Sequence, residues 1–148
     1  MFEKLKSEIT VLIENSKEVN QTLSSICDAL KSKIPHYDWV GFYFKNNKRE
    51  LILGPYAGKP TDHSTIPFGK GICGQVAVSN KNFVVPDVQA QNNYIACSLE
   101  VKSEIVIPIF VRGENIGQID IDSNTLNPFS KADETFLEFI CAKVATLL

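Results

Sequence analysis

The chain has 148 residues, of which 44% are hydrophobic and 22% are charged, and its formal net charge is −2. This length and composition are typical of one globular domain, so we expect a single domain over residues 1–148. The weakly acidic balance, without runs of Lys or Arg, argues against nucleic-acid or membrane-surface binding. No apolar stretch is long enough to cross a membrane, and residues 1–20 mix charged with apolar positions, unlike a secretory signal. We therefore expect a cytoplasmic protein.

Both ends of the chain are predicted to be helical. Apolar side chains recur at helical spacing throughout residues 2–34, and Pro35 ends that pattern. Residues 130–144 have the same periodicity. Ser130 and Asp133 stand three positions apart at their start, which is the spacing of a capping box.

Two pairs of strands are predicted between these helices. Residues 38–44 and 50–56 are rich in aromatic and branched side chains and flank a short polar turn, which is typical of a hairpin. Residues 103–111 and 115–122 form a second candidate hairpin around a turn that contains glycine. Terminal helices around antiparallel hairpins indicate the α+β class.

The middle of the chain is irregular in its pattern. Residues 57–70 are rich in Gly, Pro and Thr and are expected to be a loop, and a short helix is predicted from about Gly71 to residue 80. Residues 86–102 form a second irregular stretch. Irregular segments this long are uncommon in small domains and are often functional.

Side-chain alternation in the strands separates two kinds of face. In the first strand it places Trp39, Gly41 and Tyr43 on one face, and Val40, Phe42 and Phe44 on the other. In the last strand Asp120 and Asp122 share a face, opposite two isoleucines. This acidic face is either open to water or part of a site for an ammonium group or a metal, because paired carboxylates are costly in a core without partners.

The four cysteines stand singly, without a C-x-x-C pair, so we expect free thiols in a reducing compartment. Cys27 and Cys141 lie on the apolar stripes of the predicted helices and are interpreted as core residues. His63, Cys73 and Cys97 have no recognised zinc spacing, so no metal site is predicted. No glycine motif stands in a βαβ unit, so no dinucleotide cofactor is expected either.

Seven blocks of sequence together resemble the free methionine-R-sulfoxide reductases, which are single-domain GAF proteins. The blocks occur in the family's order and read WVGFYF, LGPYAGKP, IPFGKGICGQVA, VVPDV, YIAC, SEIVIPIF and IGQIDIDS. The resemblance covers roughly residues 36–148. It implies a six-stranded antiparallel sheet with helices on one face and a loop-covered ligand pocket on the other.

The resemblance also implies a substrate site. The aromatic wall of the family's pocket corresponds to Trp39 and Tyr43, and its substrate-binding acids correspond to Glu104, Asp120 and Asp122. These acids would hold the amino group of free methionine sulfoxide, which excludes methionine within a peptide. No cofactor is implied, and members of the family are often homodimers.

The implied chemistry is thiol-based. Cys97, in the I-A-C motif, would attack the sulfoxide sulfur while Glu104 or Asp120 protonates its oxygen, leaving a sulfenic acid on Cys97. Cys73 would condense with that sulfenic acid to a disulfide, which a thioredoxin-like thiol reduces. His63 stands where most members carry the usual resolving cysteine.

Two alternatives to this enzyme stay open. The missing resolving cysteine, and the replacement of G-H-I-A-C-D by residues 93–98 (NYIACS), are compatible with a GAF module that binds a small ligand without turnover. A redox sensor that uses Cys73 and Cys97 as a switch is the other alternative. It leaves the acidic and aromatic residues unexplained. Multiple turnovers with free methionine-R-sulfoxide are predicted only for the enzyme.

Overall fold

One twisted antiparallel sheet organises the molecule. The computed structural model describes residues 2–94 and 99–148, and within them six strands are ordered β3–β2–β1–β6–β5–β4. The strands are β1 (Trp39–Lys45), β2 (Glu50–Ala57), β3 (Thr65–Pro67), β4 (Phe83–Val85), β5 (Ser103–Val111) and β6 (Glu114–Ser123). The helices are α1 (Phe2–Glu14), α2 (Val19–Lys33), α3 (Gly71–Ser79) and α4 (Lys131–Ala145), with a 3-10 turn at Val88–Ala90. The predicted α+β class, with an antiparallel sheet of six strands, is confirmed.

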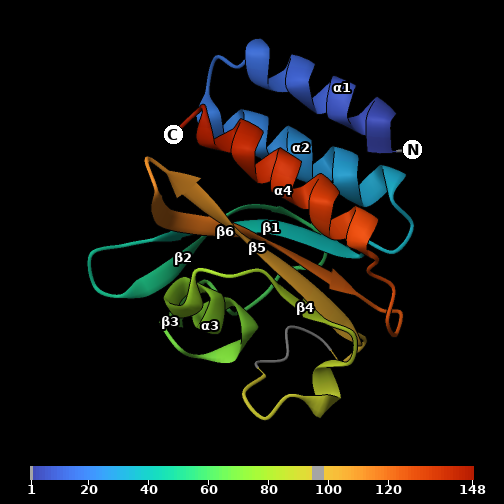
Figure 1. Ribbon diagram of the computed structural model, residues 1–148, viewed down its shortest axis with the longest axis vertical. Helices are drawn as coiled ribbons and strands as arrows, with labels where there is room; N and C mark the ends of the chain where they lie inside the picture. Colours follow the sequence, from blue (N-terminus) through green and yellow to red (C-terminus); the bar gives the residue numbers. More distant parts are fainter. Residues whose placement is uncertain (1, 95–98) are drawn as a thin grey trace.

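The two faces of the sheet are covered differently (Figure 1). The terminal helices α2 and α4 pack on one face, and α1 lies outside them as a further layer. The short helix α3 and the segments around β3 and β4 lie on the other face. Within the described residues, no helix combines the length and apolarity needed to cross a membrane.

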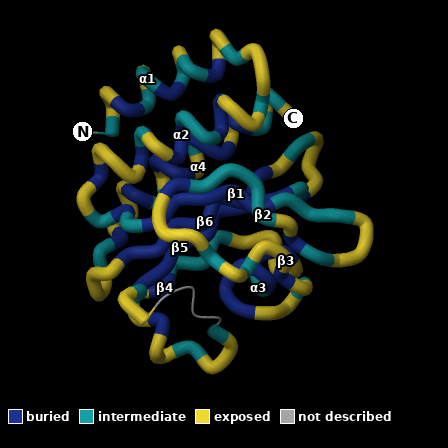
Figure 2. Tube along the Cα trace, turned by 180° about the vertical axis from the view of Figure 1, so that it is seen from behind, coloured by how far each residue is buried: buried dark blue, intermediate teal, exposed yellow. Residues whose placement is uncertain are grey.

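Each face of the sheet has its own apolar cluster. Val40 and Phe42 of β1 belong to the cluster under the terminal helices, whereas Trp39 and Tyr43 belong to the cluster under α3. This division follows the predicted alternation, because successive side chains of a strand point to opposite faces. Figure 2 shows that the central strands are buried along most of their length. The sheet is therefore covered on both sides, and the face under α3 is available for a site closed off from solvent.

The amino-terminal segment was predicted to be one helical stretch, and the structure differs from that prediction. It forms two helices, which run antiparallel and are separated by residues 15–18. The Glu18 carboxylate caps α2 by accepting hydrogen bonds from the backbone N–H groups of Asn20 and Gln21, at 3.1 and 2.6 Å. A side chain that satisfies free N–H groups marks a helix start, which apolar periodicity alone does not show.

The two edge strands were not predicted from the residue pattern. β3 lies within the expected loop 57–70, and β4 lies just before the second irregular stretch. Each has only three residues, which is too short to show alternation. Only the family resemblance led to the expected total of six.

The closing helix begins as the sequence predicted. Ser130 and Asp133 form a complete capping box, in which Asp133 also accepts hydrogen bonds from Tyr37 and His36, both at 2.8 Å. This carboxylate therefore ties the start of α4 to the connection between α2 and β1. Cys27 and Cys141 are both buried in the apolar cluster under the terminal helices, as predicted.

Candidate active site

The predicted acidic and aromatic residues form adjacent rows on the face of the sheet that α3 covers. Trp39 on β1 pairs directly with Asp122 on β6, and Asp122 pairs directly with Glu104 on β5. Asp120 lies on the same face, one row further along β6, opposite Gly41. Directly opposed residues of antiparallel strands share a face, so the sheet register brings these side chains together.

This acidic face is not open to water. The exposed fractions of Glu104, Asp120 and Asp122 are 5%, 1% and 1%. The alternative of a solvated strand face is therefore wrong for Asp120 and Asp122. Buried carboxyl groups are stable only when paired, protonated or hydrogen-bonded, so their grouping indicates a site that recognises a positive charge or holds a proton.

Cys73 joins the acids from the opposite side, near the start of α3. Its Sγ donates to Oε2 of Glu104 over 3.7 Å. The backbone of this turn is anchored to the sheet, because Nε2 of Gln118 donates to the carbonyl oxygen of Cys73 at 3.2 Å. Gln118 is a buried neighbour of the acids on β6 that sequence patterns did not single out, since a lone glutamine carries no motif.

The electrostatics of this cluster favour protonated groups. Burial raises the pKa of Asp120, although hydrogen bonds with Glu104 and Cys73 and the nearby His63 partly offset that effect. Burial also raises the pKa of the Cys73 thiol well above its ordinary value, and the charges of Asp120, Glu104 and Asp122 add to the effect. Asp120 thus keeps a proton to higher pH than an exposed aspartate, and Cys73 is held as a neutral thiol.

The aromatic pair forms one wall of the site. The ring centroids of Trp39 and Tyr43 lie 6.5 Å apart, and Tyr56 stacks on Trp39 with a centroid distance of 5.5 Å. Trp39 Nε1 donates to the carbonyl oxygen of Lys59 at 3.0 Å, and Tyr43 OH donates to that of His63 at 2.9 Å. The predicted wall is therefore hydrogen-bonded to the loop after β2. Tyr56 is an additional member that the sequence did not indicate.

Two glycines make room for the indole ring of Trp39. A Cβ atom at Gly41 would lie 2.3 Å from Cη2 of Trp39, and one at Gly58 would lie 2.6 Å from its Cδ1. Gly58 also has a φ of 131°, a conformation that favours glycine. Any side chain at either position would displace Trp39, so these glycines help to define the aromatic wall.

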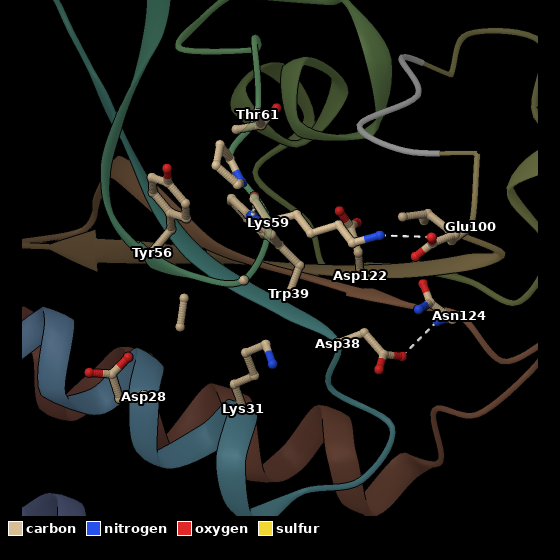
Figure 3. A pocket seen from close by; sticks show the side chains of 14 residues that line it. Asp28, Lys31, Asp38, Trp39, Tyr56, Lys59, Thr61, Glu100, Asp122 and Asn124 are labelled. Carbon is tan, nitrogen blue, oxygen red and sulfur yellow. Dashed lines mark hydrogen bonds and ion pairs between the residues drawn. The ribbon is translucent and has the colours of Figure 1, made fainter.

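The site residues are divided between two neighbouring cavities. The smaller, of about 10 Å³, is lined by Tyr43, His63, Ile66, Lys70, Gly71, Ile72, Cys73, Glu104 and Asp120. The larger, of about 730 Å³, includes Trp39, Tyr56 and Asp122, together with the ion pair between Lys59 and Glu100 at 2.7 Å (Figure 3). The smaller cavity has the size of a single water molecule. An amino acid does not fit into the smaller cavity with its covering segments in this position.

The predicted nucleophile, Cys97, lies outside the described residues. The segment that leads to it is held against the start of α3 by Asn93. Asn93 Oδ1 accepts from the backbone N–H of Gly71 at 3.0 Å, and its Nδ2 donates to the carbonyl oxygen of Gly69 at 2.7 Å. The structure thus connects the segment before Cys97 to the turn that precedes Cys73. Asn93 was noted in the sequence only as part of a departure from the family motif.

His63, at the position of the usual resolving cysteine, lines the small cavity together with Cys73. The other predicted site residues that line it, Tyr43, Glu104 and Asp120, come from three different strands. These residues are far apart in the sequence, which explains why no local spacing pattern revealed the cavity.

Comparisons with known proteins show which proteins the chain resembles. Residues 16–148 match the model of the GAF domain family. The chain is 43% identical over 118 residues to a free methionine-R-sulfoxide reductase of Saccharomyces cerevisiae, covering 78% of this chain and 65% of that protein. It is 31% identical over 147 residues to the Escherichia coli protein of the same name, covering 99% of this chain and 88% of that protein.

A solved structure shares the whole architecture. The free methionine-R-sulfoxide reductase from Neisseria meningitidis, in complex with its substrate, superimposes with a TM-score of 0.93 at 32% identity, covering 98% of this chain and 86% of that chain. Fold and sequence point to the same group of proteins. This chain is a GAF-domain protein and belongs to the free methionine-R-sulfoxide reductase family.

Proposed function

We propose that this protein reduces free methionine-R-sulfoxide to methionine. The observation that carries the proposal is the buried row of Trp39, Asp122 and Glu104, with Asp120 beside it, in a chain of this family. The Neisseria meningitidis relative binds its substrate on the same fold. An aromatic wall next to clustered acids suits a small, zwitterionic amino acid with an apolar S-methyl group.

Recognition of the free amino group is assigned to the acids. An ammonium group inserted among Glu104, Asp120 and Asp122 would exchange its hydration for charge-assisted hydrogen bonds in a region closed off from water. An acylated nitrogen has no charge and keeps only one N–H donor. Peptide-bound and N-acetylated methionine sulfoxide are therefore expected to be poor substrates.

The proton needed for the reaction is assigned to the same cluster. Reduction requires protonation of the sulfoxide oxygen as a thiolate attacks the sulfur, so the donor must still be protonated near neutral pH. Asp120 suits this role because burial raises its pKa. Glu104, which is hydrogen-bonded to Cys73, is the other candidate donor.

Two cysteines take part in the proposed reaction. The Cys97 thiolate and one proton take the oxygen from the sulfoxide, which gives methionine and a sulfenic acid on Cys97. The Cys73 thiol then condenses with it, releasing water and forming a disulfide, and two thiols of a thioredoxin-like protein reduce that disulfide. Because Cys73 is buried with a raised pKa, its attack requires local rearrangement or loss of its proton to a neighbouring carboxylate.

The reaction is proposed to take place in the cytoplasm. Free thiols and a thioredoxin-like reductant are found together in the reducing cytoplasm, where we place the reaction. The homodimer implied by the family resemblance stays a prediction that sedimentation equilibrium can check.

A turnover assay separates this enzyme from a binding module or redox sensor. Protein incubated with excess free methionine-R-sulfoxide and dithiothreitol should form many equivalents of methionine, and the S epimer should not react. At most one equivalent of methionine per protein would contradict the enzyme and favour the sensor. None, with retained binding of the sulfoxide, would favour the binding module.

Recycling needs its own measurement. After oxidation by one equivalent of substrate, mass spectrometry should find a disulfide between Cys73 and Cys97. A persistent sulfenic acid on Cys97, together with a Cys73→Ser variant that turns over with thioredoxin at the native rate, would contradict the assignment of Cys73.

A further inference from the structure

A thiol and two carboxyl groups converge at one buried point beneath α3. One potential ligand atom from each of Cys73, Glu104 and Asp120 lies within 4.8 Å of the other two. The three residues belong to α3, β5 and β6, and all are buried. Sequence spacing could not reveal this group, because Glu104 and Asp120 meet through the pairing of β5 with β6, and Cys73 joins them through the packing of α3 on the sheet.

A second observation indicates that the group is suited to a ligand. Asp120 is hydrogen-bonded with Glu104 and Cys73, but its buried Oδ1 atom has no hydrogen-bond partner within residues 2–94 and 99–148. The cavity of about 10 Å³ is lined by these same three residues. Its size suits a single small ion or one water molecule.

We propose that Cys73, Glu104 and Asp120 form a binding site for Zn²⁺. Thiolate sulfur and carboxylate oxygen are both common zinc ligands, and tetrahedral coordination places neighbouring ligand atoms about 3.5 Å apart. The distance of 3.7 Å between Cys73 Sγ and Glu104 Oε2 is already close to that value. Mg²⁺ and Ca²⁺ prefer six or more oxygen ligands, so the thiol selects against them.

His63 is positioned to provide a fourth ligand. It lines the same cavity, and its backbone is fixed by the hydrogen bond from Tyr43 OH to its carbonyl oxygen at 2.9 Å. Its ring nitrogens are not among the three clustered ligand atoms, so binding of the ion by His63 would require its side chain to rotate. Imidazole is among the preferred ligands of zinc, and this chain has it where most members of the family carry a cysteine.

Metal binding has a consequence for the site. The ion displaces the proton of the Cys73 thiol and any proton that Glu104 and Asp120 hold, and releases them to solvent. If the proposed function is correct, the ion and the substrate ammonium group compete for Glu104 and Asp120. Zn²⁺ then acts as a reversible inhibitor whose effect a chelator removes.

Co²⁺ is a suitable probe, because a thiolate ligand gives it a charge-transfer band in the near ultraviolet. The fully reduced protein, without sulfoxide or thiol reagent, should bind one equivalent of Co²⁺ with this band, and Zn²⁺ should abolish it. Cys27→Ser and Cys141→Ser are matched controls, because both remove a buried thiol on the other face of the sheet. Both should keep the band.

The variants at the site identify the ligands. Cys73→Ser should lose the band, and Asp120→Asn and Glu104→Gln should each bind Co²⁺ at least ten times more weakly. Cys97→Ser should bind Co²⁺ like the native protein. His63→Ala should weaken binding and keep the charge-transfer band. Thermal unfolding of each variant without metal shows whether it is folded.

Three outcomes would overturn the site: no charge-transfer band in the native protein, a band that survives in Cys73→Ser, or a band that is lost in Cys97→Ser. None of these measurements involves methionine sulfoxide. Binding of Co²⁺ without reduction of the sulfoxide would therefore contradict only the proposed function. Reduction of the sulfoxide without binding of Co²⁺ would contradict only the metal site.

Discussion

Trp39 and Asp122 are directly paired across β1 and β6, so an indole ring and a carboxylate stand side by side on the face of the sheet beneath α3. Both residues also line the larger cavity. This pairing combines an apolar contact with a charge that attracts an ammonium group. It makes Asp122 the most direct test of the proposed substrate site.

Replacing Asp122 by Asn should weaken substrate binding selectively. A hydrogen bond to a charged group contributes about 1.5–3 kcal/mol, so kcat/KM should fall roughly tenfold to a hundredfold, mainly through KM. Asp28→Asn is the matched control, because Asp28 is an exposed residue at the edge of the same cavity. Steady-state kinetics check both variants, and an unchanged KM in Asp122→Asn would contradict the assignment.

The cysteines should separate into reactive and structural residues. Cys97→Ser should abolish methionine formation without loss of the fold, because the nucleophile is removed. Cys27 donates to the carbonyl oxygen of Pro55, and Cys141 donates to that of Ile107. Their serine variants should stay active and lose about 1 kcal/mol of stability in urea unfolding. Native activity in Cys97→Ser would refute the mechanism.

Gly41→Ala should damage the aromatic wall. The added methyl group would collide with the indole ring of Trp39, and overpacking of this kind costs about 1–3 kcal/mol. KM should also rise, because the ring is displaced. Gly113→Ala is the control, because no described atom lies within 4 Å of the place that its Cβ would take. This substitution should lower the stability by only about 1 kcal/mol, because Gly113 has a positive φ, and should leave KM unchanged. Equal kinetics for the two variants would show that Trp39 does not shape the site.

Asn93→Ala should lower kcat more than it lowers stability. The substitution removes the hydrogen bonds that join the segment before Cys97 to Gly69 and Gly71. Poorer positioning of the nucleophile should reduce kcat several-fold, whereas Asn93 is exposed and contributes little to the core. Asn92→Ala, an exposed neighbour, is the control. A clear loss of stability with unchanged kcat would assign Asn93 a purely structural role.

Asp133 should make the stability depend on pH. Burial raises its pKa, but hydrogen bonds from Ser130, His36 and Tyr37 outweigh that effect and hold the pKa below its ordinary value of 3.8. A lowered pKa stabilises the fold at pH above the unfolded value, and this contribution disappears as the pH falls through the folded value.

Asp133→Asn should therefore be less stable than the native protein at pH 7, by about 1–3 kcal/mol. The difference should shrink below pH 4, where the unfolded aspartate takes up its proton. Urea unfolding at several pH values measures this dependence. A difference that is independent of pH would show that the charge of Asp133 is not what stabilises the start of α4.

Local patterns in the sequence determined the central elements. Helical spacing identified the terminal helices, and Ser130 marked the start of α4, because a cap uses only nearby residues. Alternation placed Trp39 and Tyr43 on one face, because side chains along a strand have a period of two. The short edge strands and the break between α1 and α2 were missed, since they leave little or no periodic signal.

The site itself was decided by tertiary structure. The sequence showed that Asp120 and Asp122 share a face, but their burial depends on α3, which folds over that face from a distant part of the chain. The contact between Cys73 and Glu104 likewise spans 31 positions and has no sequence signature. Which side chains a strand presents is a local property of the chain. Whether they meet water, a thiol or a ligand depends on what packs against them.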